Sequence, residues 1–155
     1  MAPPDLLRPL EGQRELTLRV VEGLAPGDLE RTDRQTGWTV RQLCGHLVSA
    51  ELAVAFVIRR ALDGEVMHLT QEERDSFNEA QVDGAADWDV SRIGSELRAA
   101  LAALREVFEG MTEEDLDRAI RWPEWPARTI RTSIPYMVEH EDSHLDQIKE
   151  AIKSS

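Results

Sequence analysis

Apolar residues recur along the chain at the three- and four-residue spacing of amphipathic helices, and β-type alternation never extends beyond a few residues. Four long stretches carry this pattern, over residues 5–24, 39–63, 89–110 and 132–153. Thr39 is expected to cap the second stretch, which has the longest apolar stripe. Pro135 is expected in the first turn of the last stretch, where a missing N–H costs little.

The segments between these stretches predict one further element. Thr70 followed by Glu73 forms a capping-box pattern and predicts a shorter helix over residues 71–82. A short turn is expected over 112–115, and the two prolines within 121–126 predict irregular backbone there. The pattern therefore predicts an all-α fold: a four-helix bundle with a crossover connection and one additional short helix, in a single domain over 1–155.

The amino-acid composition limits the kinds of partner that the protein can bind. The 155 residues are 41% hydrophobic and 31% charged, as in a globular domain, and the net charge of −12 disfavours phosphate-rich partners. No uncharged apolar run approaches the roughly 18 residues of a membrane span, and the N-terminus lacks the basic segment of a secretory signal. The single cysteine excludes an internal disulfide. We expect a cytoplasmic protein with neither a nucleic-acid nor a membrane partner.

The histidines carry the candidate chemistry. His140 and His144 are four residues apart, which places both imidazoles on one helix face, where they can share a divalent cation. His46 lies at the margin of the apolar stripe of the second helix and can point into the same cleft. Taken singly, each histidine also fits a packed or solvated position. His68 is expected in a surface loop.

A second motif overlaps the first. His140, Glu141 and His144 match H-E-x-x-H, the helix of zinc proteases in which the glutamate is the general base. Such sites take their third ligand from downstream, yet only 11 residues follow His144 and none is a histidine. The missing sheet edge also disfavours this alternative.

Two blocks resemble one family. The segment Gly37-Trp38-Thr39-Val40-Arg41-Gln42-Leu43-Cys44-Gly45-His46-Leu47, with Glu51 five residues after the histidine, resembles the second-helix motif of the DinB/YfiT-like superfamily. The segment from Glu139 to Ile148, with its His-x3-His pattern and following Gln-Ile pair, resembles the last-helix motif of the same superfamily.

The resemblance implies a metal held by His46, His140 and His144, with further coordination positions open to water or substrate. It also implies frequent homodimers and, in some members, transferases or isomerases that use low-molecular-weight thiols such as mycothiol or bacillithiol. Open positions are typical of catalytic metal sites. Zinc or nickel is the expected ion, with iron or manganese as alternatives.

Glu141 lies only about 20° from the centre of the apolar stripe on the last helix, so its carboxylate needs a buried partner. It is a candidate catalytic acid/base, a candidate acceptor that orients a ligand histidine, or half of a salt bridge to an arginine of another helix. Cys44 is about 200° around the helix from His46 and is expected to be a buried small residue.

Four residues are candidates for the substrate pocket. Trp38 and Trp122 are candidates for its walls, and Arg41 and Arg131 for holding a substrate carboxylate. Trp125 falls in the same irregular segment as Trp122. Packing and surface ion pairs are the alternatives for all of them.

Two functions remain open. The first is a divalent-metal-dependent enzyme, a thiol S-transferase or a related transferase, isomerase or hydrolase acting on a small molecule. The second is a non-catalytic, dimeric metal- or ligand-binding bundle with a role in stress response. Solvent access to the open metal positions separates them, because a triad sealed under Trp38 and Trp122 favours the second.

Overall fold

A computed structural model of the protein describes residues 2–65, 70–121 and 129–153, and within these ranges it contains helices and no strands. The long helices are α1 (Arg8–Glu22), α2 (Val40–Leu62), α4 (Val90–Glu109) and α5 (Ile130–Lys153), and the shorter one is α3 (Gln71–Gly84). Three 3-10 turns cover Pro3–Leu7, Pro26–Glu30 and Glu114–Asp117. The predicted all-α class is confirmed.

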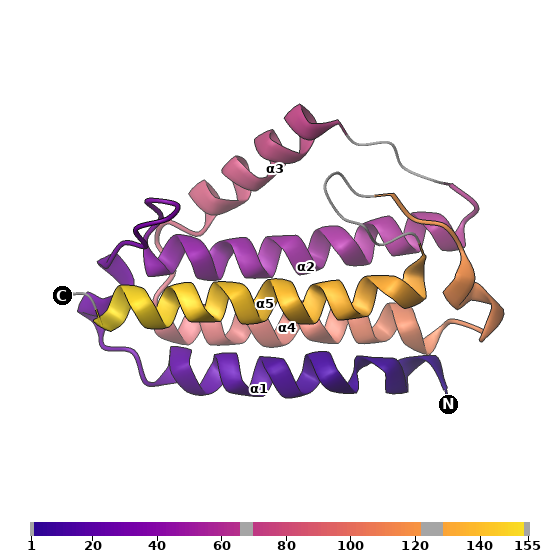
Figure 1. The fold of residues 1–155 in the computed structure, drawn as a ribbon, viewed down its shortest axis with the longest axis horizontal. Helices are drawn as coiled ribbons and strands as arrows, with labels where there is room; N and C mark the ends of the chain where they lie inside the picture. Colours follow the sequence, from indigo (N-terminus) through magenta and orange to yellow (C-terminus); the bar gives the residue numbers. More distant parts are fainter. Residues whose placement is uncertain (1, 66–69, 122–128, 154–155) are drawn as a thin grey trace.

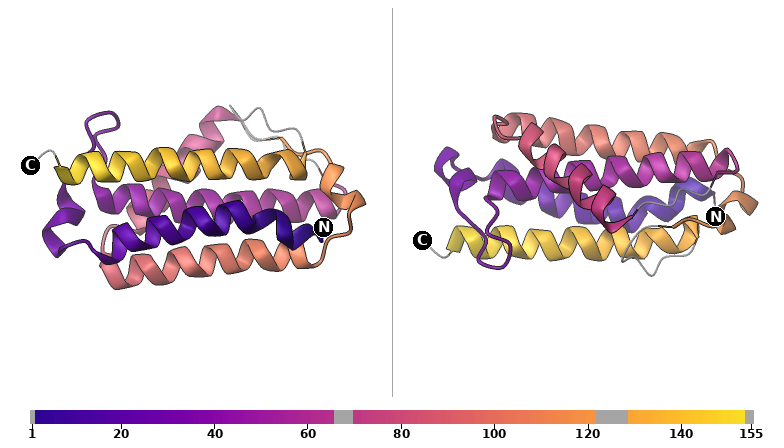
Figure 2. Two further views of the ribbon diagram at one scale, coloured as in Figure 1. Left: turned by 60° about the horizontal axis from the view of Figure 1, so that its bottom comes forward. Right: turned by 90° about the horizontal axis from the view of Figure 1, so that it is seen from above.

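The four long helices form a bundle in which α1 packs against α4 and α5, and α2 packs against the same two helices (Figures 1 and 2). Neighbours in sequence, α1 and α2, therefore lie diagonally across the bundle. Helices α1 and α5 run in one direction, whereas α2 and α4 run in the other (Figure 1). Helix α3 lies outside the bundle against α2 and returns the chain to the start of α4, so it forms the predicted crossover.

Caps define the starts of three helices. The Thr39 hydroxyl accepts a hydrogen bond from the Gln42 N–H, and the Gln42 side chain accepts one from the Thr39 N–H, which closes a capping box. Thr70 and Glu73 form the predicted box at α3. Asp89 caps α4 by accepting from the Arg92 N–H. These side chains satisfy amide donors that the first helical turn leaves without partners.

Two helix starts differ from the prediction. The first segment begins as the 3-10 turn Pro3–Leu7, and the α-helix begins only at Arg8, because three prolines in the first nine residues remove amide donors. The last helix begins at Ile130, two residues earlier than expected, so Pro135 lies inside it. Ile130 is fully buried, and its packing fixes this start.

The core has two apolar halves with a polar layer between them. One cluster, which includes Leu10, Val54 and Met137, fills the end of the bundle near the N-terminus, and the other includes Val21 and Ile148. On α1, α2 and α5 the boundary between the two clusters falls at buried polar or charged residues. These residues are Arg14 and Thr17 on α1, Ser49 and Glu51 on α2, and Glu141 on α5. The polar layer is where the candidate site lies.

Helix α2 is long and apolar enough to cross a membrane by length and composition, but 78% of its most apolar stretch is buried inside the bundle. Packing thus explains its hydropathy. The burial suggests a soluble protein.

Gly45 sets how closely the α3–α4 connection approaches α2. A Cβ atom at Gly45 would lie 2.6 Å from the Cβ of Ala85, closer than two carbon side chains can pack. The absent side chain lets Ala85, fully buried, rest directly on α2 one residue before His46.

Candidate metal centre

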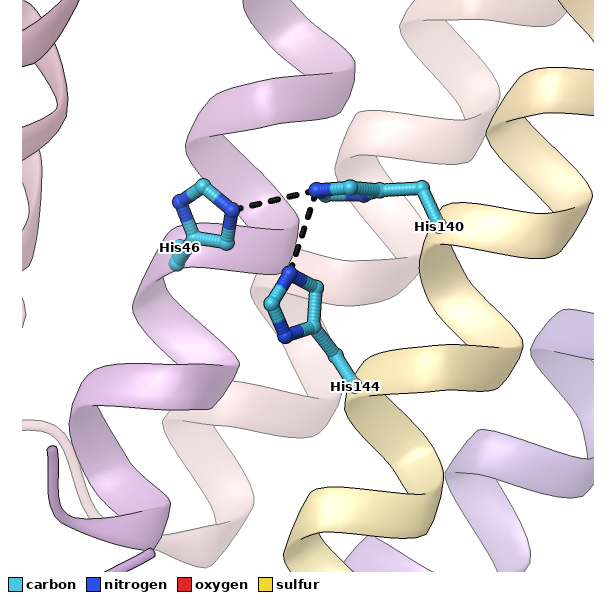
Figure 3. A group of neighbouring side chains, drawn as sticks. All are labelled: His46, His140 and His144. Atoms are coloured by element: carbon cyan, nitrogen blue, oxygen red, sulfur yellow. Dashed lines mark hydrogen bonds between the residues drawn. The ribbon is translucent and has the colours of Figure 1, made fainter. Parts of the chain in front are cut away.

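His46 projects from α2 toward His140 and His144 on the facing side of α5 (Figure 3). The Nε2 atom of His140 lies 3.1 Å from the Nε2 of His46 and 3.1 Å from the Nε2 of His144. One ligand atom from each ring lies within 4.8 Å of the others. The structure therefore brings together the three histidines singled out in the sequence, although 94 residues separate the first two.

The spacing of these nitrogens fits a divalent cation. A tetrahedral ion with metal–nitrogen bonds of about 2.0–2.1 Å holds its ligand nitrogens about 3.3–3.4 Å apart. The two Nε2 contacts of 3.1 Å lie close to that value. Three imidazoles would leave one tetrahedral position for water or a substrate atom, as in catalytic rather than structural zinc sites.

The neighbouring Gln147 orients His144. The Nδ1 of His144 lies 2.6 Å from Oε1 of Gln147, and the Gln147 amide nitrogen donates to Gln35 at 3.0 Å. Because an amide oxygen only accepts, the His144 proton lies on Nδ1 and its Nε2 presents a lone pair to the other two histidines. This is the arrangement that outer-shell partners impose on ligand histidines in metal sites.

The histidines are held in the neutral form that metal ligands need. Burial lowers the pKa of His46 to about 4 and that of His140 to about 3, with smaller contributions from neighbouring charges, His144 among them. Burial also lowers the pKa of His144. At neutral pH all three rings are uncharged, so protons do not compete with a cation for their lone pairs.

The Glu141 carboxylate is bonded to two α1 side chains of the polar layer. Arg14 Nε donates to both carboxylate oxygens at 3.1 Å, and Arg14 Nη2 donates to Oε1 at 2.6 Å. The Thr17 hydroxyl donates to Oε2 at 2.8 Å. Of the three roles considered for Glu141, the structure shows the salt bridge to an arginine of another helix. A catalytic role for this carboxylate stays a prediction, and its contacts do not favour it.

The same contacts bear on the zinc-protease alternative. That mechanism needs Glu141 beside the metal and a third ligand from downstream, whereas this carboxylate binds Arg14 and the third histidine comes from α2, far upstream. The H-E-x-x-H match is therefore explained without protease chemistry.

Glu51 is the second carboxylate on Arg14 and was not identified as a site residue from the sequence. Its Oε2 contacts Arg14 Nη2, and its Oε1 is buried without a hydrogen-bond partner in the described part of the chain. Burial raises the pKa of Glu51 to about 7, against the lowering effect of Arg14. A cavity of about 20 Å³ touches Glu51, Glu141 and His140, which links the polar layer to the histidine cluster.

Solvent reaches the histidine cluster. His46 is buried, whereas His140 and His144 are each partly exposed. Trp38 packs against the His46 ring with centroids 5.3 Å apart, so the structure places this predicted pocket residue at the site.

Two surface clefts border residues that contact the histidines, although none of the three histidines lines either cleft. One, of about 410 Å³, is lined by Trp38 and by residues of α3. The other, of about 430 Å³, is lined by Gln35 and Gln147, the residues that orient His144. Both are large enough for a small molecule.

The other predicted pocket residues lie elsewhere. The Arg41 guanidinium donates to the Trp88 carbonyl at 2.8 Å and pairs with Glu30, so it ties α2 to two connecting segments. Arg131 pairs with Asp117 in the turn before α5 and is not brought to the histidines. Ion pairs explain both arginines.

Three residues discussed from the sequence, Trp122, Trp125 and His68, lie outside the described residues.

Cys44 is fully buried in the apolar cluster, as predicted, and burial raises the pKa of its thiol to about 12. Such a thiol is not available as a nucleophile or ligand at neutral pH.

A family model described as the DinB superfamily matches residues 10–148, nearly the whole chain. The chain belongs to the DinB superfamily. The resemblance drawn from the two histidine motifs is thereby confirmed. A relative of similar length, the uncharacterized protein YuaE of Bacillus subtilis strain 168, is 24% identical over 147 residues, which cover 86% of this chain and 89% of YuaE.

Two solved structures share the fold of this DinB protein. YfiT from Bacillus subtilis, described as a probable metal-dependent hydrolase with an unusual four-helix bundle topology, matches 95% of this chain and 83% of its own, with a TM-score of 0.75 and 20% identity. A mycothiol-dependent maleylpyruvate isomerase matches 96% of this chain with a TM-score of 0.78 and 11% identity. The chain spans only 61% of that isomerase. Both likenesses show the fold.

Proposed function

We propose that this DinB protein is a metal-dependent enzyme whose divalent ion is held by His46, His140 and His144. The observation that carries the proposal is the convergence of three neutral imidazoles with their Nε2 atoms at metal-ligand spacing. Zinc or nickel is the proposed ion, since imidazole suits both. The ion would supply a Lewis acid that lowers the pKa of a bound water or thiol.

The chain's own residues account for the rest of the site. Gln147 keeps the His144 proton on Nδ1, and desolvation keeps all three ligand histidines neutral. Trp38 packs against His46, and the clefts that border Trp38 and Gln147 have room for a small substrate. No buried nucleophile is needed, and the Cys44 thiol is held protonated.

The proposed reaction is transfer to or from a low-molecular-weight thiol. The mycothiol-dependent isomerase, which shares the fold, supports this class, and YfiT supports hydrolysis as the second candidate. Both reactions suit the same site, because the nucleophile is a thiol in one case and water in the other. We further propose a cytoplasmic homodimer. Analytical ultracentrifugation tests the dimer, and a single species of 17.5 kDa would refute it.

The test has two stages. Purified protein is first depleted of metal with a chelator, reloaded with zinc, nickel, iron or manganese, and its bound metal is measured. We expect the wild-type protein to bind about one ion per chain. The His140→Ala variant, treated in the same way, should lose this binding.

Each loaded form is then offered an electrophile with several low-molecular-weight thiols, and separately a panel of ester and amide substrates without thiol. Turnover that requires both metal and thiol supports the transferase. Turnover without thiol supports the hydrolase. Stoichiometric metal binding without turnover in either screen would favour the non-catalytic alternative.

A further inference from the structure

The polar layer buries one positive and two negative groups. Arg14, Glu51 and Glu141 are 1%, 6% and 3% exposed. Ionised groups at this depth cost free energy unless each is paired and hydrogen-bonded. The two carboxylates do not share Arg14 equally, because Glu141 accepts more hydrogen bonds than Glu51. This difference indicates that Glu51 has a further, positively charged partner.

Glu141 accepts most of the hydrogen bonds that Arg14 donates. It receives three hydrogen bonds from the guanidinium and a fourth from the Thr17 hydroxyl, and Arg14 Nη1 donates to the Leu97 carbonyl at 2.5 Å. Glu51 has only one oxygen on Arg14, and within the described residues nothing hydrogen-bonds its other oxygen. One cation thus faces two carboxylates, and Glu51, the less well bonded of the two, carries a surplus negative charge when both are ionised.

The surplus charge lies next to the histidine cluster. Glu51 and His140 border the same cavity of about 20 Å³, which has room for a single water molecule. The rest of its wall is mainly apolar, formed by residues such as Leu10, Val54 and Met137, and the Glu51 side chain is itself buried, so solvent screens its charge less than it would at the surface. An ion held by His140 and the other two neutral imidazoles would keep its full double positive charge, because these ligands carry no negative charge.

We propose that Glu51 is the buried counter-charge of the metal centre, stabilising the divalent ion across the cavity without ligating it. This inference rests on the proposed metal binding. In the metal-free protein the Glu51 carboxylate destabilises the folded state, because one of its buried oxygens lacks a hydrogen-bond partner among the described residues. In the metal-bound protein the attraction between the buried carboxylate and the divalent ion, which solvent screens less than at the surface, offsets that cost.

Glu51→Gln tests the proposal, because the amide keeps the shape of the side chain and removes its charge. Zinc affinity is measured by competition with a chromophoric chelator at pH 8, where the Glu51 carboxylate is ionised. The melting temperature of the metal-free protein is measured alongside. The matched control is Glu22→Gln, which makes the same chemical change at an exposed salt bridge to Arg98.

We expect Glu51→Gln to raise the zinc dissociation constant about tenfold and to leave the metal-free melting temperature unchanged or higher. Glu22→Gln should change the dissociation constant by less than twofold, because solvent and salt screen an exposed charge. The tenfold effect should persist in 0.5 M salt, as expected for a buried charge.

A change below threefold in Glu51→Gln, or an equal change in Glu22→Gln, would overturn the proposal. A fall in the melting temperature of metal-free Glu51→Gln would also overturn it, because that result makes the carboxylate a structural ion-pair partner. If wild-type protein binds no zinc, the proposed function fails as well, so the two failures are distinguishable.

Discussion

Replacing His46 should make the metal-free protein less sensitive to acid. Burial lowers the pKa of His46 from 6.5 to about 4, so between these values the unfolded chain binds a proton at this position and the folded protein does not. Stability contributed by the neutral ring is complete above pH 6.5 and is lost as the pH falls toward 4. The full shift of about 2.5 pKa units corresponds to about 3.4 kcal/mol, and the part between pH 7 and pH 5 to about 2 kcal/mol.

Glu51 acts in the opposite sense over the same range. Its pKa is raised from 4.5 to about 7, so the folded protein takes up a proton before the unfolded chain does. Protonation of Glu51 therefore stabilises the folded protein by about 2 kcal/mol as the pH falls from 7 to 5, and this stabilisation is lost as the pH rises again. The wild-type profile alone mixes these effects with those of the other histidines, and the informative quantity is a difference between variants.

The assay is urea unfolding of chelator-treated wild type and His46→Gln at pH 7 and pH 5, followed by circular dichroism. The loss of unfolding free energy between the two pH values should be about 2 kcal/mol smaller in His46→Gln than in wild type. Equal losses in the two proteins would show that His46 is solvated in the folded state, which would refute its placement between α2 and α5.

His46→Ala and His144→Ala should each weaken zinc binding by more than about 100-fold in chelator competition, since loss of an outer-shell partner alone accounts for 10–100-fold; an effect confined to His144 would contradict a site that spans two helices. Gln147→Leu should weaken zinc binding about tenfold without lowering the helical signal, because the His144 tautomer is no longer fixed; unchanged affinity would exclude that role. Gly45→Ala should destabilise the protein by about 1–3 kcal/mol in urea unfolding through its clash with Ala85, and a neutral result would show that the α3–α4 connection yields easily.

Most of the fold was predictable from local pattern. The helices follow from apolar periodicity, and the caps at Thr39, Thr70 and Asp89 mark their starts, because each cap depends on residues three positions apart. The start of α5 was not predictable in this way. It depends on burial of Ile130 against distant parts of the chain, which outweighs the cost of Pro135 inside the helix.

The histidine cluster was predictable because its residue type is rare and its spacing is local on α5. The polar layer was missed, although a signal was present. Arg14 occupies the position between Leu10 and Thr17 where the apolar stripe of α1 should continue, so a charge there indicates a buried partner. Which carboxylates it meets depends on how α1, α2 and α5 pack, and no single helix carries that information.

The diagonal placement of α1 and α2 has a consequence for the order of folding. The bundle helices α1 and α2 do not pack against each other, and neither do α4 and α5, so most helix pairs of the bundle join segments far apart in sequence. Topologies rich in such long-range pairs fold more slowly than those rich in local contacts. His46 and His140 meet only when segments 94 residues apart have docked. Metal binding during refolding would therefore report when the whole bundle has closed. The rate of metal binding would follow the slowest long-range docking step rather than helix formation.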